Sequence, residues 1–290
     1  MKYAAIDIGS NAIRLLIAEV KSTGNLKQYK KVSLIRVPVR LGDDSFISKK
    51  ISKSKIEDFY KTMLAFKSLM EVHKVEKYMA CATSAMREAK NGQDIIDKVN
   101  AKLNLKIEIV AGGKEASIIY ASHVEESLDR NKNYLYIDVG GGSTELSLFY
   151  NGKISQSKSF NIGTIRILDG QDKAGTWEAM KLWVEQHVKE LKLSAIGTGG
   201  NINKLFRLSG TEEGAAMTKN RLFEIYEYLK SYSIEDRIDK LGLNKDRADV
   251  IIPASEIFLS IMNWGGIDEI YVPRLGMVDG IIQILMDKHL

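Results

Sequence analysis

The stretch Ile137-Asp138-Val139-Gly140-Gly141-Gly142-Ser143-Thr144-Glu145 decides the fold class, because Ile6-Asp7-Ile8-Gly9-Ser10-Asn11 repeats its pattern near the start of the chain. In both stretches an apolar strand reaches an aspartate, passes through glycine and a hydroxyl residue, and continues into a second strand. A Rossmann fingerprint needs a helix directly after the glycines, whereas residues 145–150 alternate as a strand. A Walker A loop needs a lysine directly after its last glycine, whereas Ser143 follows Gly142 here. We therefore expect two strand–turn–strand units rather than either common nucleotide motif.

The surrounding pattern repeats as well. The first half predicts strands at 3–8, 12–20 and 28–39, a helix that begins near Ser52 or Ser54, a strand at 78–82, a helix at 93–103, a strand at 107–110 and a helix at 114–128. Beyond the second turn we expect helices at 176–191, 219–232, 247–262 and 277–288, and short strands at 194–196 and 269–272. An internal repeat of this order predicts two similar α/β domains. We place them at 1–112 and 113–290 and leave open whether the last helix packs back on the first domain.

The composition fits a globular protein with two cores. The chain has 290 residues, of which 44% are hydrophobic and 27% charged. The only cysteine, Cys81, lies in an apolar strand, so we expect a core residue rather than a nucleophile, and the histidines show no metal-ligand spacing. No apolar run suits a signal peptide or a membrane span, which predicts a cytoplasmic location and no membrane partner.

The charge favours an anionic ligand only weakly. The formal net charge is +5, but the lysines are dispersed and accompany no nucleic-acid motif. We therefore expect no nucleic-acid partner.

The two glycine turns have the chemistry of a phosphate site. Glycine backbones approach a ligand closely, and successive N–H groups form a concave anion site. The candidate phosphate-binding residues are Gly9, Ser10, Asn11, Gly140, Gly141, Gly142, Ser143 and Thr144. The carboxylates of Asp7, Asp138 and Glu145 suit a Mg²⁺ ion that bridges phosphate oxygens, with Mn²⁺ as the alternative. Ordinary hairpin turns also contain Asp and Gly, but the match between the two turns favours phosphate binding.

Several further segments match one known family in order. They are Ala5 to Asn11 with Arg14, Ala82 to Ala89, Gly113 to Ala116, Ile137 to Leu146, Gly163 to Ile167, Ile196 to Gly200 and Arg247 to Ile251. Together they resemble the exopolyphosphatase and guanosine pentaphosphate phosphatase family (Ppx/GppA), in a short two-domain form without the C-terminal helical domain of longer relatives. The resemblance implies an α/β fold of two ribonuclease-H-like domains around a central cleft, as in the actin, sugar kinase and heat-shock ATPase superfamily.

The same resemblance implies a Mg²⁺-dependent transfer of a terminal phosphoryl group to water. Glu115 stands where the family has a general base, although a first-turn glutamate is also favoured by the helix dipole. Arg87, expected on a loop after a strand, would contact phosphate. Arg14 would do so too, or would be an exposed strand residue. The chain departs from the family pattern at Lys114, Asn201 and Val278.

The function expected from these features is release of terminal orthophosphate from inorganic polyphosphate, guanosine pentaphosphate or both. One alternative is a kinase of the same superfamily that transfers phosphate from ATP. Another is a non-catalytic sensor of polyphosphate or an alarmone, against which the retained Glu115 argues. The sequence does not separate the two substrates, and it leaves a homodimer open.

Overall fold

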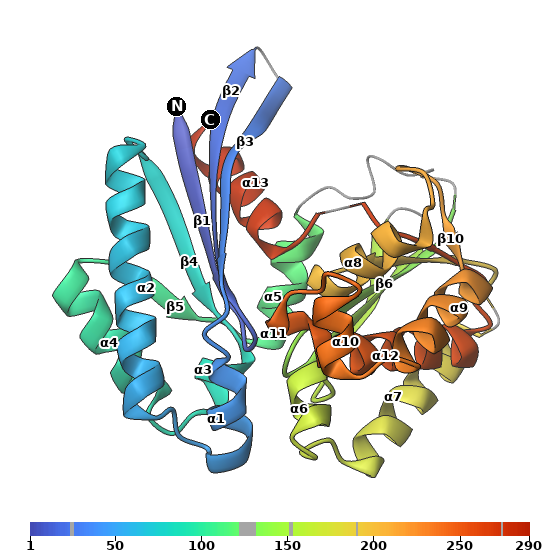
Figure 1. Ribbon diagram of the computed structural model, residues 1–290. Coiled ribbons are helices and arrows are strands. Elements are labelled where there is room, and N and C mark those ends of the chain that lie inside the picture. Colours follow the sequence, from blue (N-terminus) through green and yellow to red (C-terminus); the bar gives the residue numbers. More distant parts are fainter. Residues whose placement is uncertain (24–25, 122–131, 151–152, 190, 274) are drawn as a thin grey trace. The chain divides into compact units, whose positions relative to one another are not determined.

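The computed structural model describes residues 1–23, 26–121, 132–150, 153–189, 191–273 and 275–290. The chain forms two compact units, the first made of Met1–His123 with Gly276–Leu290 and the second of Val124–Leu275. Each unit is an α/β structure built on one sheet (Figure 1). No helix among the described ranges is both long and apolar enough to span a bilayer.

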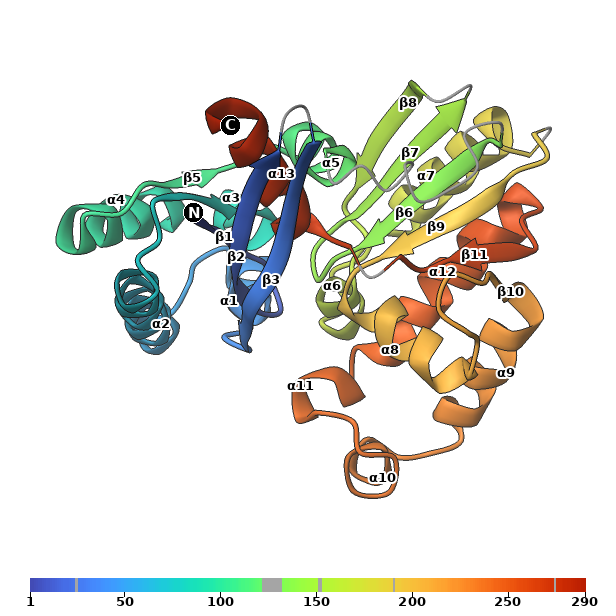
Figure 2. The same ribbon diagram turned by 90° about the horizontal axis from the view of Figure 1, so that it is seen from above.

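The first unit contains a five-stranded sheet in the order β3-β2-β1-β4-β5. Strands β1, β2 and β3 pair antiparallel, and β4 and β5 continue the sheet parallel to β1. The strands are β1 Lys2–Ile8, β2 Ile13–Thr23, β3 Leu26–Val37, β4 Lys77–Ala82 and β5 Ile107–Ile109. The helices are α1 Leu41–Ser48, α2 Lys53–Val72, α3 Ser84–Glu88, α4 Gly92–Leu103, α5 Gly112–Tyr120 and α13 Met277–His289. Helix α2 packs with α4, and α13 packs with α5 and with β1 (Figures 1 and 2).

The second unit contains a six-stranded sheet in the order β10-β11-β9-β6-β7-β8. Its strands are β6 Tyr134–Val139, β7 Thr144–Tyr150, β8 Lys153–Phe160, β9 Ser194–Thr198, β10 Met217–Thr218 and β11 Glu269–Tyr271. Its helices are α6 Thr164–Leu168, α7 Ala174–His187, α8 Gly200–Ser209, α9 Lys219–Lys230, α10 Ile234–Asp239, α11 Lys245–Ala248 and α12 Ile251–Gly265. The apolar helix α12 lies at the centre of the core and contacts α7, α8 and α9.

The two sheets share one topology, which confirms the repeat. The order β3-β2-β1-β4-β5 corresponds to β8-β7-β6-β9-β11, with the same antiparallel and parallel pairings. The registers agree as well, because Asp7 lies opposite Arg14 and Asp138 lies opposite Glu145. The first and second glycine turns therefore occupy equivalent positions in their sheets.

The compact units divide differently from the predicted boundary at 112/113. Helix α5 follows that boundary in sequence but packs against α13 and belongs to the first unit. Helix α13 also belongs to the first unit, although 152 residues of the second unit separate it from the rest. The remainder of the helix expected at 114–128 lies beyond residue 121, outside the described residues.

The start of helix α2 confirms one of the two predicted positions. The helix begins at Lys53 with Ser52 as its N-cap, because the Ser52 hydroxyl accepts a bond from the Lys55 amide, so Ser54 lies inside the helix. One local prediction differs from the structure. Arg87 lies in helix α3 rather than on a loop, because the Arg87 amide donates to the Thr83 carbonyl and closes a helical turn.

Candidate functional site

The carboxyl ends of the parallel strands β1, β4 and β5 lie at one edge of the first sheet. The first glycine turn follows β1, α3 follows β4 and α5 follows β5. The Thr83 amide and hydroxyl both donate to the Ile8 carbonyl, at 3.1 and 3.3 Å, and tie the first two connections together. In open α/β sheets this edge is where ligands bind. The fold thus brings the first turn, Arg87 and Glu115 to one edge of the first unit.

The first turn is a tight connection between β1 and β2. The Gly9 amide donates to the Ala12 carbonyl at 3.2 Å. The carbonyls of Ser10 and Asn11 accept bonds from the amides of Gly42 and Arg40, at 2.9 and 3.0 Å. In a planar trans peptide the C=O of one residue and the N–H of the next point in opposite directions, so the amides of Asn11 and Ala12 point away from this contact.

The Ser10 hydroxyl lies beneath the turn rather than at its surface. It is within 2.9 Å of the Ser84 hydroxyl, and both residues are buried. This bond joins the first turn to the start of α3. A direct bond from the Ser10 hydroxyl to phosphate stays a prediction.

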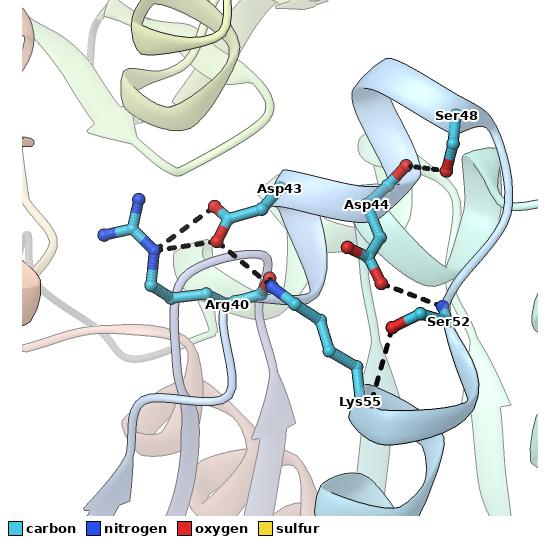
Figure 3. A network of polar contacts seen from close by, with 6 residues as sticks. All are labelled: Arg40, Asp43, Asp44, Ser48, Ser52 and Lys55. Carbon is cyan, nitrogen blue, oxygen red and sulfur yellow. Dashed lines mark hydrogen bonds and ion pairs between the residues drawn. The ribbon is translucent and has the colours of Figure 1, made fainter.

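A polar network supports the first turn from the side of α1 (Figure 3). Arg40 has a left-handed backbone with φ 54°, and its Nε donates to the Asp43 carboxylate at 3.0 Å. Lys55 Nζ reaches the same carboxylate at 3.1 Å and also contacts the Arg40 carbonyl. Asp44 accepts a bond from the Ser52 amide at 2.8 Å. The network joins α1 to the start of α2, and the Arg40 amide links it to the Asn11 carbonyl of the first turn.

Asp7 and Arg14 form an ion pair across β1 and β2. Arg14 Nη1 lies 2.7 Å from Asp7 Oδ2, Asp7 is buried, and the Arg14 side chain is 31% exposed. The predicted metal ligand and the predicted phosphate contact are therefore partners of each other. Because Arg14 compensates the charge of Asp7, this pair attracts a cation less than two carboxylates would.

Arg87 and Glu115 also lie together. Arg87 Nη1 donates to the Val110 carbonyl at 2.7 Å and lies 3.8 Å from Glu115 Oε2. The Glu115 side chain, in the first turn of α5, is 11% exposed. The pair places a cation suited to phosphate beside a carboxylate able to accept a proton.

Cys81 lies next to Asp7 in the sheet but is not suited to nucleophilic attack. Its backbone pairs with Asp7 in parallel register, and its side chain is buried. Burial, followed by the charge of Asp7, raises the pKa of the Cys81 thiol to about 12. The thiol therefore stays protonated at neutral pH, in agreement with the prediction of a core residue.

The second glycine turn connects β6 and β7. The Gly140 amide donates to the Ser143 carbonyl at 2.9 Å, which reproduces the bond between Gly9 and Ala12. The carbonyls of Gly140, Gly141 and Gly142 accept bonds from the Thr164 amide at 3.0 Å, the Ile165 amide at 2.9 Å and Arg166 Nε at 2.9 Å, respectively. By the same trans-peptide geometry, the amides of Gly141, Gly142 and Ser143 point away from α6. Successive amides that face one side are the arrangement from which anion-binding concavities are built, and anion binding by this turn stays a prediction.

The hydroxyl residues of the second turn are buried. Ser143 is buried, and the buried Thr144 hydroxyl donates to the Ile162 carbonyl at 2.7 Å. Thr144 thus anchors the strand end to the segment before α6. A role for these two hydroxyls in phosphate binding stays a prediction.

Asp138 and Glu145 lie directly opposite each other on β6 and β7, and therefore on the same face of the sheet. Asp138 Oδ1 accepts a bond from the Thr198 hydroxyl at 2.8 Å, and Glu145 Oε1 accepts one from the Ser159 hydroxyl at 2.8 Å. Gly199 reaches this point with φ 106°, and a Cβ there would lie 3.3 Å from Asp138 Oδ1. Where the first sheet pairs Asp7 with an arginine, the second pairs two carboxylates.

This carboxylate pair fits a hard divalent cation better than Asp7 does, since its donors are oxygens of like charge. Within the described part of the chain, no group of three His, Cys, Asp or Glu side chains gathers to hold a metal ion. Water or phosphate oxygens would have to complete the coordination, as Mg²⁺ commonly allows.

Two residues that support the second turn had no role assigned from the sequence. A Cβ on Gly163 would lie 2.5 Å from the carbonyl carbon and oxygen of Gly141 and from the Gly142 nitrogen, so only glycine fits without movement. The buried Arg166 donates to the Gly142 carbonyl. Both lie in the Gly163 to Ile167 segment, which the sequence marks as one of the family's motifs. The motif gave no indication of their contacts with the second turn.

Comparison with known proteins gives one family model that matches, described as the Ppx/GppA phosphatase family, over residues 16–289. A bifunctional 3-dehydroquinate synthase/phosphatase of Fusobacterium nucleatum is 32% identical over 96% of this chain, which spans only 46% of that protein. An exopolyphosphatase 1 of Mycobacterium leprae is 22% identical over 100% of this chain and 91% of its own length. A guanosine-5'-triphosphate,3'-diphosphate pyrophosphatase of Aliivibrio fischeri is 24% identical over 99% of this chain, which spans 59% of that protein.

The fold recurs among solved structures. A crystal structure of an exopolyphosphatase from Cytophaga hutchinsonii superposes with a TM-score of 0.85 at 20% sequence identity. The superposition covers 99% of this chain and 98% of that one. At 20% sequence identity, this comparison supports the fold alone.

Proposed function

Because this chain belongs to the Ppx/GppA phosphatase family, we propose that it is a hydrolase that releases the terminal orthophosphate from a phosphoanhydride chain. The observation that carries the proposal is the placement of Glu115 beside Arg87, at the strand edge that also bears the first glycine turn. A phosphoryl-transfer site needs groups that position phosphate and a group that orients the attacking water. This edge of the first unit offers both.

The substrate class is a linear or nucleoside-linked polyphosphate. Relatives named exopolyphosphatase and guanosine-5'-triphosphate,3'-diphosphate pyrophosphatase align with nearly the whole of this chain. Both names imply substrates that carry a phosphoanhydride. We propose inorganic polyphosphate and guanosine pentaphosphate as the two substrates to compare.

In this proposal the phosphate groups bind to backbone amides and to arginine. In the first unit, the candidate amides are those of Asn11 and Ala12, which point away from the element that bonds to the preceding carbonyls. In the second unit, the candidate amides are those of Gly141 to Ser143, which point away from α6 in the same way. Arg87 would contribute charge-assisted bonds to a phosphate oxygen. Preorganised donors of this kind stabilise the charge that spreads over the phosphoryl oxygens in the transition state.

Glu115 would orient the attacking water and accept its proton. Its carboxylate lies at the start of α5 and is held near the Arg87 guanidinium. General-base assistance is typically worth about 10² to 10⁴ in rate. The proton would pass from the attacking water to a Glu115 carboxylate oxygen as the water oxygen bonds to the terminal phosphorus. The bond from that phosphorus to the bridging oxygen would break, and the shortened chain would leave with the bridging oxygen.

We propose Asp138 and Glu145 as the residues that would hold Mg²⁺, with Mn²⁺ as a substitute. When bound, the ion would neutralise charge on phosphate oxygens. Thr198 and Ser159 would orient the two carboxylates through the hydroxyl bonds described above.

The test measures orthophosphate release with Mg²⁺ from short polyphosphate, long polyphosphate, guanosine pentaphosphate and ATP. The wild-type protein is compared with Glu115→Gln and with the control Glu108→Gln, an exposed glutamate of the same unit that pairs with Lys114. We expect Glu115→Gln to lose at least about 100-fold in turnover while still binding the chain, and Glu108→Gln to be unaffected. Wild-type turnover in Glu115→Gln would refute the assigned base. Transfer to an acceptor without orthophosphate release would indicate a kinase, and binding without turnover in the wild type would indicate a sensor.

A further inference from the structure

One buried carboxylate, that of Asp279, joins the start of helix α13 to strand β3. We call its contacts with Tyr29, Lys31 and the Gly276 amide the clasp. Asp279 is 2% exposed, and its Oδ1 accepts a bond from the Tyr29 hydroxyl at 2.7 Å and lies 2.7 Å from Lys31 Nζ. Its Oδ2 accepts a bond from the Gly276 amide at 3.0 Å. Burial, and then the Asp279 charge, raise the pKa of Tyr29, so its hydroxyl remains a donor. Asp279 thus fixes where α13 begins on the first sheet.

The next residue, Gly280, fixes how α13 meets helix α5. A Cβ on Gly280 would lie 1.7 Å from the Ile118 carbonyl oxygen and 2.7 Å from the Ile118 carbonyl carbon. The two helix backbones therefore touch at this point, with Ile118 and Ile119 buried beside it. A contact without an intervening side chain transmits a shift of one helix to the other, because nothing compressible separates them.

Glu115 lies one turn before Ile118 on the same helix. Its carboxylate must stay near Arg87, whose own position is set by its bond to the Val110 carbonyl. A displacement of α5 along or about its axis would therefore change the distance between Glu115 and Arg87. Helix α5 packs against α13 at Gly280, and Asp279 fixes the start of α13 on strand β3.

We infer that Asp279 is a positioning residue for Glu115, acting through Gly280 and the α5 backbone; the inference rests on the proposed role of Glu115. Tyr29 and Lys31 act with it as the donors that hold its carboxylate. None of these residues contacts the proposed phosphate-binding groups in the bonds described above. Their effect is on the rate of the chemical step rather than on the capture of substrate.

The chain offers a matched control at the other end of α13. Lys27 Nζ lies 3.6 Å from the Asp287 carboxylate, so this pair also joins β3 to α13. Asp287 is half exposed and lies two turns beyond the contact with α5. Asp279→Asn and Asp287→Asn therefore make the same chemical change to the same pair of elements, but only Asp279 is adjacent to Gly280, the residue that touches α5.

The experiment compares kcat and KM for phosphate release in both variants. A misplacement of a catalytic group by about 1 Å costs up to about 100-fold, so we expect Asp279→Asn to lower kcat at least about tenfold. The KM of Asp279→Asn should stay within about twofold of the wild-type value. Asp287→Asn should match the wild type in both kcat and KM. In a Glu115→Gln background, Asp279→Asn should cause no further loss, because the positioned group is already disabled. Equal kcat in the two variants, or a loss confined to KM, would overturn the inference.

A second measurement does not depend on activity. Hydrogen exchange over 112–120 should be faster in Asp279→Asn than in Asp287→Asn if the clasp holds α5. If the wild type released no phosphate, the proposed function would fail while this comparison still tested the clasp. Equal exchange in the two variants would overturn the clasp itself. Tyr29→Phe, which removes one donor only, supplies the same readouts with a smaller expected effect should Asp279→Asn not fold.

Discussion

Gly163→Ala should distort the second glycine turn. The added Cβ would lie 2.5 Å from three backbone atoms of Gly141 and Gly142, a separation that real Cβ atoms do not show. Backbone atoms cannot rotate away as a flexible side chain does. Either the turn or the start of α6 must move, and the bonds between them must lengthen or break.

The magnitude follows from the bonds at risk. The Thr164 amide, the Ile165 amide and the Arg166 guanidinium each donate to a carbonyl of the turn. At about 1 kcal/mol each, their loss would lower the free energy of unfolding by about 3 kcal/mol. The amides of Gly141 to Ser143 would also lose their common orientation, and affinity for tripolyphosphate should fall about tenfold or more.

Urea unfolding and calorimetric titration with tripolyphosphate and Mg²⁺ measure the two effects. Gly175→Ala is the matched control, since it adds the same methyl group in the same unit, on helix α7, where a Cβ has no neighbour within 4 Å. It should leave stability unchanged or raise it by up to about 1 kcal/mol, and leave affinity unchanged. If Gly163→Ala unfolded within about 0.5 kcal/mol of Gly175→Ala and bound tripolyphosphate equally well, the proposed packing of α6 on the turn would be refuted.

Three further perturbations test other contacts. Arg166→Met removes the buried donor to the Gly142 carbonyl and should lower the free energy of unfolding in urea by about 2 kcal/mol, whereas the exposed Arg221→Met should change it by no more than about 0.5 kcal/mol. Arg14→Ala leaves the buried Asp7 carboxylate without its cation and should cost about 2 kcal/mol at pH 7, much of it recovered by adding Asp7→Asn; no loss in the single variant would contradict the ion pair. Native Cys81 should resist Ellman's reagent at pH 8 and react after unfolding, and rapid labelling of the native protein would contradict its burial. Because folding raises the pKa of this thiol, its contribution to stability is complete below the unfolded pKa and is lost as the pH rises towards about 12.

Much of the first sheet and of the repeat could be predicted because the signals are local. Strands β1 and β6 are apolar runs that are each followed directly by glycine, and the register of a hairpin follows from its turn. The pattern around Asp7 and Asp138 therefore predicted equivalent hairpins, and the ordered motifs predicted the family that the comparison confirms. The short helices α1, α3 and α6 were not predicted, since helices of five to eight residues depend on tertiary contacts for their stability.

The sequence by itself determined the α/β class, the two glycine turns and the residue types available for phosphate chemistry, because these depend on short windows of the chain. The tertiary structure decided the partners: Arg14 for Asp7, Arg87 for Glu115, and Ile162 for Thr144. It also decided that α5 packs against α13, a helix more than 150 residues away in sequence. Such contacts arise when distant surfaces bury apolar area together and satisfy buried charges, and no local pattern specifies which surfaces those are.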